Sequence, residues 1–182
     1  MVSSLKFEKP FIIAEIGGNH EGDFEYAKKL LIEAADAGAD AVKFQTYYPD
    51  KIVSKIEDEA RHKHFSKFVL PIEKYIELAE IAKINNVLFM SSVWDIDSLK
   101  VLNKYIDIHK IGSGDLTNYP LIEEILKTNK PFIFSVAMSE MSEIHETVQF
   151  IKDINPSYIN QNKLAILQCV AMYGQPEDRF AN

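Results

Sequence analysis

The stretch FIIAEIGGNHEGDFEYAKKLLIEAADAGADAVKFQT, residues 11–46, contains two short apolar runs separated by an amphipathic segment. The runs at 11–16 and 41–46 predict β-strands, and the segment 24–37 predicts a helix with an apolar stripe along one side. Asp23 is placed to cap the start of this helix. Two strands joined by such a helix indicate a parallel βαβ unit.

The alternation of strands and helices continues along the chain. Further strands are predicted at 87–92, 107–112, 131–136 and 163–169, and further helices at 72–85, 96–105, 119–128 and 142–153. The charged segment 50–70 predicts a helical insertion. This pattern predicts an α/β fold, either a TIM (β/α)8-type barrel or an open doubly wound sheet. A complete barrel takes about 250 residues. We therefore expect 182 residues to form one domain, 1–182, of an apparently incomplete barrel with about six βα units.

Composition excludes several classes of protein. The net charge of −7 argues against broad nucleic-acid binding. A single cysteine, Cys169, allows no disulfide framework within the chain and indicates a reducing compartment. The sequence shows neither the apolar core of a signal peptide nor a run of about 18 apolar residues. We expect a cytoplasmic protein without a membrane span.

Polar residues recur where the predicted strands end. Glu15 and Lys43 interrupt the apolar runs of the first two strands, and Lys110 does so in the fourth. The serines and aspartate that follow or end later strands are Ser92, Ser113, Asp115 and Ser135. Ligands of α/β proteins bind beyond the carboxyl ends of parallel strands, so we expect a binding site at this rim.

The residue types indicate the chemistry of that site. Two lysines among serines and glycines suit a phosphate or a carboxylate. Two carboxylates, Glu15 and Asp115, suit proton transfer or contact with a metal-bound water. A purely structural ion pair between Glu15 and Lys43 on neighbouring strands is the alternative.

Other reactive side chains have simpler interpretations. His20 follows a glycine pair in a rim loop and suits ligand contact and loop structure equally. His62 and His64 lie in the charged insertion and are expected to be solvated, whereas His109 is expected to be structural. Trp94 is expected to pack rather than to stack on a substrate, and Cys169 to be an inert core thiol.

The motifs AEIGGNHEGD, AVKFQT, FMSS, HKIGSGDLTNYPLI and YGQPEDRF, in this order, resemble those of the sialic acid synthase family. Its members include N-acetylneuraminate, legionaminic acid and pseudaminic acid synthases. The resemblance implies a TIM barrel followed by a C-terminal antifreeze-like domain. It implies a transferase of carbohydrate biosynthesis that condenses phosphoenolpyruvate with an N-acetylated amino sugar and releases phosphate. A divalent metal, manganese or magnesium, is implied as cofactor.

The resemblance also implies roles for individual residues. Lys43, Lys110, Ser113 and Ser135 would hold phosphoenolpyruvate, and Ser92 would offer it a hydroxyl. Glu15 and Asp115 would transfer protons and orient the metal-bound water or the sugar carbonyl. The family's metal-binding histidines and its antifreeze-like domain would lie beyond Asn182, so we expect no metal ligand within this chain. The family's STGM reads SVAM at 135–138 here, and its His-Cys-Thr reads QCV at 168–170.

Two rival functions share this fold. The chain could serve another phosphoenolpyruvate-dependent reaction, that of the 3-deoxy sugar-acid synthases, or be a non-catalytic binding and assembly module. An unclosed sheet has two edge strands, which favour pairing with another copy. We therefore expect a homo-oligomer.

Overall fold

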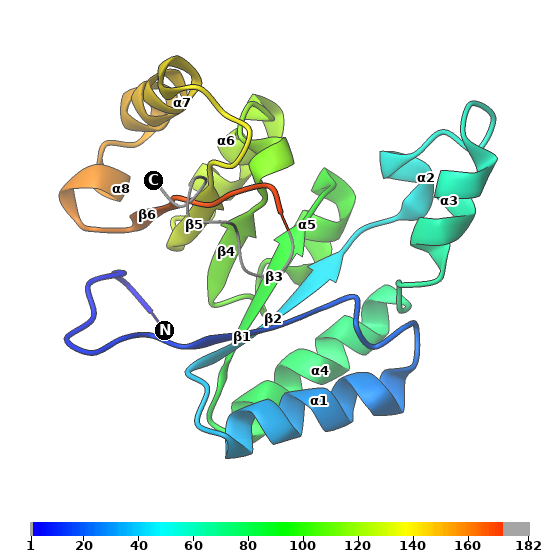
Figure 1. Cartoon of the computed structure of the whole chain (residues 1–182). Coiled ribbons are helices and arrows are strands. Elements are labelled where there is room, and N and C mark those ends of the chain that lie inside the picture. Colours follow the sequence, from blue (N-terminus) through cyan, green and yellow to red (C-terminus); the bar gives the residue numbers. More distant parts are fainter. Residues whose placement is uncertain (1, 173–182) are drawn as a thin grey trace. The chain divides into compact units, whose positions relative to one another are not determined.

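The computed structural model describes residues 2–172 (Figure 1), so the YGQPEDRF motif lies outside the described residues. The strands in this range are β1 (Ile13–Gly17), β2 (Ala41–Thr46), β3 (Leu88–Val93), β4 (Ile108–Ile111), β5 (Phe132–Ser135) and β6 (Leu164–Leu167). The helices are α1 (Phe24–Asp36), α2 (Pro49–Ile52), α3 (Glu59–Ser66), α4 (Ile72–Ile84), α5 (Ile96–Leu102), the 3-10 turn η1 (Ser113–Asp115), α6 (Tyr119–Lys127), α7 (Met141–Ile154) and α8 (Ser157–Asn160). Every strand and helix predicted from the sequence is present.

The strand order distinguishes the two predicted architectures. It runs β1-β2-β3-β4-β5-β6, without a strand taken out of sequence. The pairs β1–β2, β2–β3 and β5–β6 are parallel. A doubly wound sheet reverses its strand order at a switch point, whereas a barrel keeps the order of the chain. The fold is therefore α/β, and it is a partial TIM-type barrel, as predicted.

Backbone contacts divide the chain into two compact units. The first contains residues 7–109, and the second contains residues 2–6 together with the chain from Lys110 onward. The division falls within β4, between His109 and Lys110.

In the first unit, α1 and α4 pack together and cover one face of β1, β2 and β3 (Figure 1). Asp23 caps α1 as predicted, because its side chain accepts a hydrogen bond from the Tyr26 amide. Ala27 and Leu31 form the buried stripe of this helix. Gly38 follows the helix with φ +89°, a backbone conformation that side chains with a Cβ rarely adopt. Asp23 and Gly38 therefore set the start and the end of the helix in the first βαβ unit.

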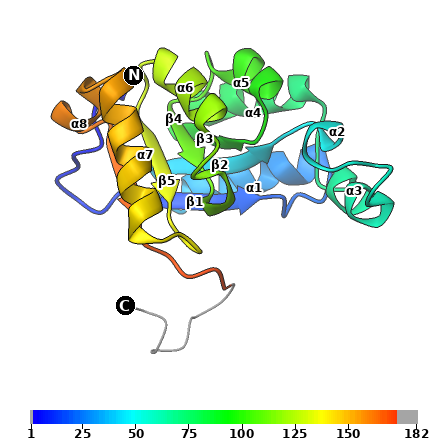
Figure 2. The same cartoon turned by 90° about the horizontal axis from the view of Figure 1, so that it is seen from above.

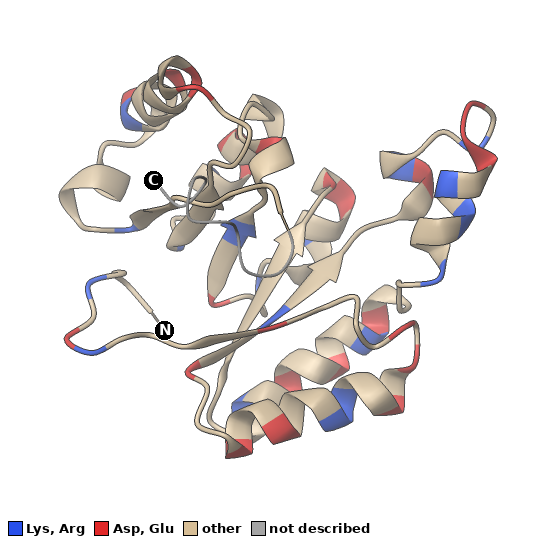
Figure 3. Cartoon of the chain, in the orientation of Figure 1, with Lys and Arg blue, Asp and Glu red and all other residues tan. Residues whose placement is uncertain are grey.

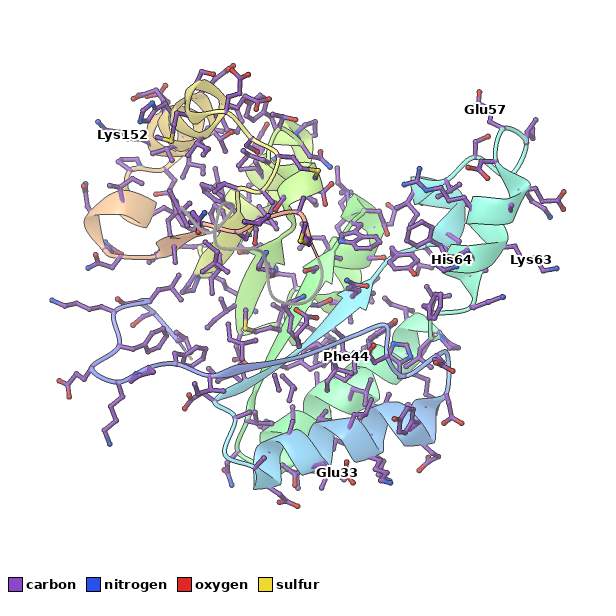
Figure 4. The ribbon with its side chains drawn as sticks, in the orientation of Figure 1. Glu33, Phe44, Glu57, Lys63, His64 and Lys152 are labelled. Carbon is purple, nitrogen blue, oxygen red and sulfur yellow. The ribbon has the colours of Figure 1, made fainter. Side chains whose placement is uncertain are left out.

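Phe44 is the centre of the first unit's core. The side chains of a strand alternate between its two faces, so Phe44 points away from its neighbour Lys43. Its ring is fully buried and stacks on Phe89 of β3 at 5.8 Å between centroids. It also meets Tyr75 of α4 edge-on at 6.3 Å. Figure 4 shows Phe44 on the side of β2 that α4 covers, whereas Glu33 of α1 points away from the sheet.

The charged segment 50–70 contains α2 and α3, which confirms the helical insertion.

An aromatic cluster attaches α3 to the ends of two strands. Tyr47 after β2 stacks on Trp94 after β3, with 4.7 Å between ring centroids and 7° between planes. Phe65 of α3 meets both rings edge-on. Trp94 therefore packs within the protein, as predicted.

In the second unit, α6 and α7 pack against each other (Figure 2). Asn118 caps α6 by accepting the Leu121 amide, and Leu121 starts the buried stripe of this helix. Tyr158 of α8 is fully buried and packs on Phe132 of β5. The Leu5 amide donates to the Asn162 carbonyl, which attaches residues 2–6 to this unit.

Charged residues are unevenly distributed over the elements (Figure 3). They are frequent on the helices and loops and rare on the strands. A charged residue within a strand is therefore an exception, and both Glu15 and Lys43 are such exceptions. No helix within residues 2–172 combines the length and the apolar character needed to cross a membrane.

Candidate active site

The first cluster of predicted site residues consists of Glu15, Lys43 and Ser92, all in the first unit. Glu15 and Lys43 are directly paired in the register of β1 and β2. The Lys43 ammonium donates to Glu15 Oε2 at 2.6 Å and to Ser92 Oγ at 3.1 Å. Lys43 is 7% exposed and Glu15 is 54% exposed. The sequence predicted that these residues would meet, and the structure brings them together.

A bend in β1 accommodates the Glu15 carboxylate. The register between β1 and β2 shifts between Glu15 and Gly17. Gly17 has φ +56°, and a Cβ at this position would lie 3.2 Å from Glu15 Oε1. The backbone conformation favours glycine here, and a Cβ would require the Glu15 carboxylate to shift slightly.

The second cluster lies in the second unit and is centred on Lys110 at the end of β4. Its ammonium donates to Ser135 Oγ at 2.6 Å and to the Ile111 carbonyl at 2.7 Å. Ser135 is the last residue of β5, as predicted, and it is buried. Each cluster therefore joins a lysine ammonium to a serine hydroxyl.

A cavity of about 320 Å³ adjoins this second cluster. Ser113, Ser135 and Cys169 contribute polar atoms to its lining, and Ala137, Met138 and residues 170–172 contribute apolar ones. The Ala137 amide donates to Ser113 Oγ at 3.1 Å. The cavity has room for a small organic anion.

Cys169 is not the inert core thiol that the sequence predicted. It is partly exposed and lines the cavity, because β6 ends at Leu167 and leaves the ladder before reaching it. Ser113 Oγ lies 3.6 Å from its sulfur. Burial raises the pKa of the thiol, but hydrogen bonds from Ser113, from the backbone of residues 136–137 and from Ser135 outweigh it and lower the pKa overall. A sequence pattern cannot show backbone donors of this kind, because every residue except proline carries one.

Asp115 ends the 3-10 turn that follows β4. Burial raises the pKa of its carboxyl, and this effect exceeds the opposing effects of a hydrogen bond from Asn118 and of the Lys110 charge. The Asn118 amide nitrogen lies 3.5 Å from Asp115 Oδ1. A carboxyl group with a raised pKa is a suitable proton donor and acceptor. The roles predicted for Asp115 and the other six residues stay predictions.

His20 has a structural role in the loop after β1. It is fully buried, and its Nδ1 accepts a hydrogen bond from the Gly22 amide at 3.1 Å. This bond places the ring proton on Nε2, which has no hydrogen-bond partner among the described residues. Phe44 and Tyr75 lie beside the ring. Burial lowers the pKa of His20, so the neutral form is favoured.

This burial makes the stability of the protein dependent on pH. Below pH of about 6.5, the unfolded chain takes up a proton at His20 that the folded chain does not bind. The free energy of unfolding should therefore decrease as the pH is lowered below about 6.5. His20 contributes at most about 1.4 kcal/mol per pH unit to this decrease. His20→Asn keeps an acceptor for the Gly22 amide but does not titrate. Urea unfolding between pH 8 and pH 5.5 should show a flatter pH profile for the variant; two parallel profiles would contradict this role.

The described residues offer no obvious metal site. Within residues 2–172, no group of three or more His, Cys, Asp or Glu side chains could hold a metal ion. His62 was predicted to be solvated, but its side chain is only 13% exposed and contacts Asp50 at 2.6 Å.

The fold and the two clusters define an α/β-barrel protein with lysine and serine side chains at the ends of its strands. The chain belongs to the NeuB family, whose model matches residues 30–181. This confirms the resemblance found in the sequence motifs.

The chain is also similar in sequence and structure to individual proteins. An uncharacterized protein of Methanocaldococcus jannaschii is 38% identical over 172 residues, which are 94% of this chain and 49% of that protein. The N,N'-diacetyllegionaminic acid synthase of Campylobacter jejuni is 34% identical, over 93% of this chain and 54% of the enzyme. The crystal structure of N-acetylneuraminic acid (sialic acid) synthetase from Leptospira borgpetersenii, in complex with citrate, is 30% identical with a TM-score of 0.84. It matches 94% of this chain and 57% of that chain. The present chain thus spans about half the length of these relatives.

Proposed function

We propose that this chain forms the phosphoenolpyruvate-binding barrel of a sialic acid synthase-type transferase. The reaction would join phosphoenolpyruvate to an N-acetylated amino sugar, giving a nine-carbon sugar acid and phosphate. The observation that carries the proposal is the pairing of two strand lysines with serine hydroxyls, Lys43 with Ser92 and Lys110 with Ser135. Membership of the NeuB family supports the same reaction class.

The donors in the two clusters match the chemistry of phosphoenolpyruvate. This molecule carries a carboxylate and a phosphate, and their oxygens accept hydrogen bonds from ammonium and hydroxyl groups. Each cluster supplies one ammonium and at least one hydroxyl. Hydrogen bonds between charged partners are roughly twice as strong as those between neutral ones. We therefore propose, as the family resemblance implies, that Lys43, Lys110 and the serines beside them contact phosphoenolpyruvate.

The reaction also needs proton transfer. Water attacks C2 of the enolpyruvate, C3 attacks the sugar aldehyde, and the phosphate leaves from C2. The water gives up both of its protons in the overall reaction: one is delivered to the aldehyde oxygen, and the other, lost as the C2 hydroxyl becomes the ketone, leaves with the phosphate. We assign this proton transfer to the carboxyl groups of Glu15 and Asp115. The raised pKa of Asp115 supports its role, because it brings proton exchange closer to neutral pH.

Metal binding is a proposal about groups outside the described residues. The family resemblance implies manganese or magnesium, which would supply Lewis-acid chemistry. Within residues 2–172, no group of three or more His, Cys, Asp or Glu side chains could hold such an ion. We therefore assign the described residues to anion binding and proton transfer. Cytoplasmic location and homo-oligomer formation likewise stay predictions.

Phosphate release tests this function. The chain is incubated with phosphoenolpyruvate, manganese or magnesium, and a panel of N-acetylated hexosamines. We expect phosphate release that depends on the sugar. Release with phosphorylated aldoses alone would favour a 3-deoxy sugar-acid synthase. Binding of phosphoenolpyruvate without release under any condition would favour the non-catalytic module.

Asp115→Asn should separate catalysis from stability. We expect the rate of phosphate release to fall by about 100-fold or more, because general acid–base groups contribute typically 10²–10⁴. Since the folded pKa of Asp115 is raised, its contribution to stability exists at low pH and is lost as pH rises through that pKa. The free energy of unfolding at pH 7 should therefore not decrease in the variant. Asp153→Asn, on the exposed side of α7, is the matched control and should change neither quantity; a stable variant with full activity would remove Asp115 from the mechanism.

A further inference from the structure

The two members of the Glu15–Lys43 pair differ in how firmly they are held. Lys43 is 7% exposed and lies within β2, hydrogen-bonded to the buried Ser92. Glu15 is 54% exposed and lies beside the shifted register of β1. The ammonium is thus fixed in the protein, and the carboxylate has space to leave it.

A buried ammonium needs an anionic partner. A lysine side chain that loses its counter-charge away from water is strongly destabilised. In the structure without a ligand, Glu15 provides this charge at 2.6 Å. An ammonium donates up to three hydrogen bonds, and two are accounted for by Glu15 and Ser92. An incoming carboxylate or phosphate would approach the same charge and would be repelled by Glu15.

We propose that Glu15 is the resting counter-ion of Lys43 and that an anionic group of the ligand takes its place. The ligand would then satisfy Lys43 and release the Glu15 carboxylate from the ion pair. This inference rests on the proposed function, because it takes phosphoenolpyruvate as the ligand. It gives Glu15 an effect opposite to that of an ordinary binding residue: its negative charge weakens ground-state binding.

The neutral variant Glu15→Gln tests this exchange, in which an anionic group of the ligand replaces Glu15 as the partner of Lys43. Glutamine keeps the size of the side chain and removes the competing charge. Calorimetry with phosphoenolpyruvate should show about tenfold tighter binding, since removal of like-charge repulsion and release of the ammonium act in the same direction. Glu33→Gln is the control, because Glu33 pairs with Lys29 on the exposed face of α1 at 3.8 Å (Figure 4). It should leave the affinity unchanged.

A double variant shows whether the gain acts through Lys43. Lys43→Met should weaken the binding of phosphoenolpyruvate, and adding Glu15→Gln to it should restore little affinity. If the tenfold gain persists without Lys43, the effect is one of general charge, and the counter-ion role is wrong. A structural role alone would change unfolding curves of Glu15→Gln but would not make its effect on affinity depend on Lys43.

The remaining outcomes separate this inference from the proposed function. If the unaltered chain binds phosphoenolpyruvate and Glu15→Gln binds it equally or more weakly, the exchange is overturned and the anion site stands. If neither the unaltered chain nor any variant with an intact unfolding transition binds it, the proposed anion site fails, and the exchange fails with it. Glu15→Ala, which removes the charge differently, should also bind more tightly and guards against a misfolded glutamine variant.

Discussion

Phe44→Ala should lower the free energy of unfolding by about 3–5 kcal/mol, the cost typical of removing a buried phenylalanine ring. The ring is fully buried and contacts Phe89 on the neighbouring strand and Tyr75 on α4. It also lies 6.1 Å from the His20 ring, between centroids. Because the ring packs against both a strand and a helix, a small shift of one element would not fill the cavity. Urea unfolding followed by circular dichroism measures the loss.

Ile84→Ala is a suitable control for this substitution. Ile84 is the last residue of α4 and is 77% exposed, so its truncation should change the free energy of unfolding by less than about 0.5 kcal/mol. A cost for Phe44→Ala below about 1.5 kcal/mol would contradict the close packing of this core. Phe44 is also the immediate neighbour of Lys43. Loss of the ring should therefore loosen the strand that presents the lysine and weaken ligand binding as well.

The periodicity of apolar residues was sufficient to predict the strands and helices of an α/β fold, but it left a barrel and a doubly wound sheet as alternatives. β2 occupies residues 41–46 in both the prediction and the structure, because a buried strand between a glycine-containing turn and a proline has clear limits. The predictions were less accurate where turns decide the ends. The strand predicted at 163–169 ends at Leu167, and the helix predicted to reach 105 ends at Leu102. Local hydrogen bonding of a few residues sets these ends, and apolar periodicity does not report it.

The placement of the candidate site residues on the strands was predictable, but their exposure and surroundings were not. Alternation along β1 and β2 placed Glu15 beside Lys43, and register confirms this. The unequal exposure of the two side chains depends on the register shift in β1. In the sequence, only the glycines at 17 and 18 indicate that the strand is irregular there. The surroundings of Cys169 were missed, because backbone amides of residues 136–137 create them. Hydrogen bonds from backbone amides do not depend on the identity of the side chain, so the sequence does not show them.

Lys110→Met should weaken the binding of phosphoenolpyruvate by about 100-fold. Hydrogen bonds to charged groups contribute about 1.5–3 kcal/mol each, and each 1.4 kcal/mol is tenfold in affinity. The substitution removes the ammonium that donates to Ser135 at 2.6 Å. It therefore removes a positive charge that is hydrogen-bonded to Ser135, one of the residues lining the cavity. Calorimetry of the purified chain, titrated with phosphoenolpyruvate at fixed ionic strength, gives the change.

Two further variants make this expectation specific. Lys127→Met removes the same charge from the exposed end of α6, where Lys127 pairs with Glu123 and Glu124, and should leave affinity unchanged. Ser135→Ala keeps the ammonium and removes one hydroxyl, so its loss of affinity should be smaller, about tenfold. If Lys110→Met and Lys127→Met lost the same amount of affinity, phosphoenolpyruvate binding would depend only on the net charge of the protein. An unchanged affinity in a folded Lys110→Met chain would place the anion away from β4 and β5, and the proposed site would then rest on Lys43 alone.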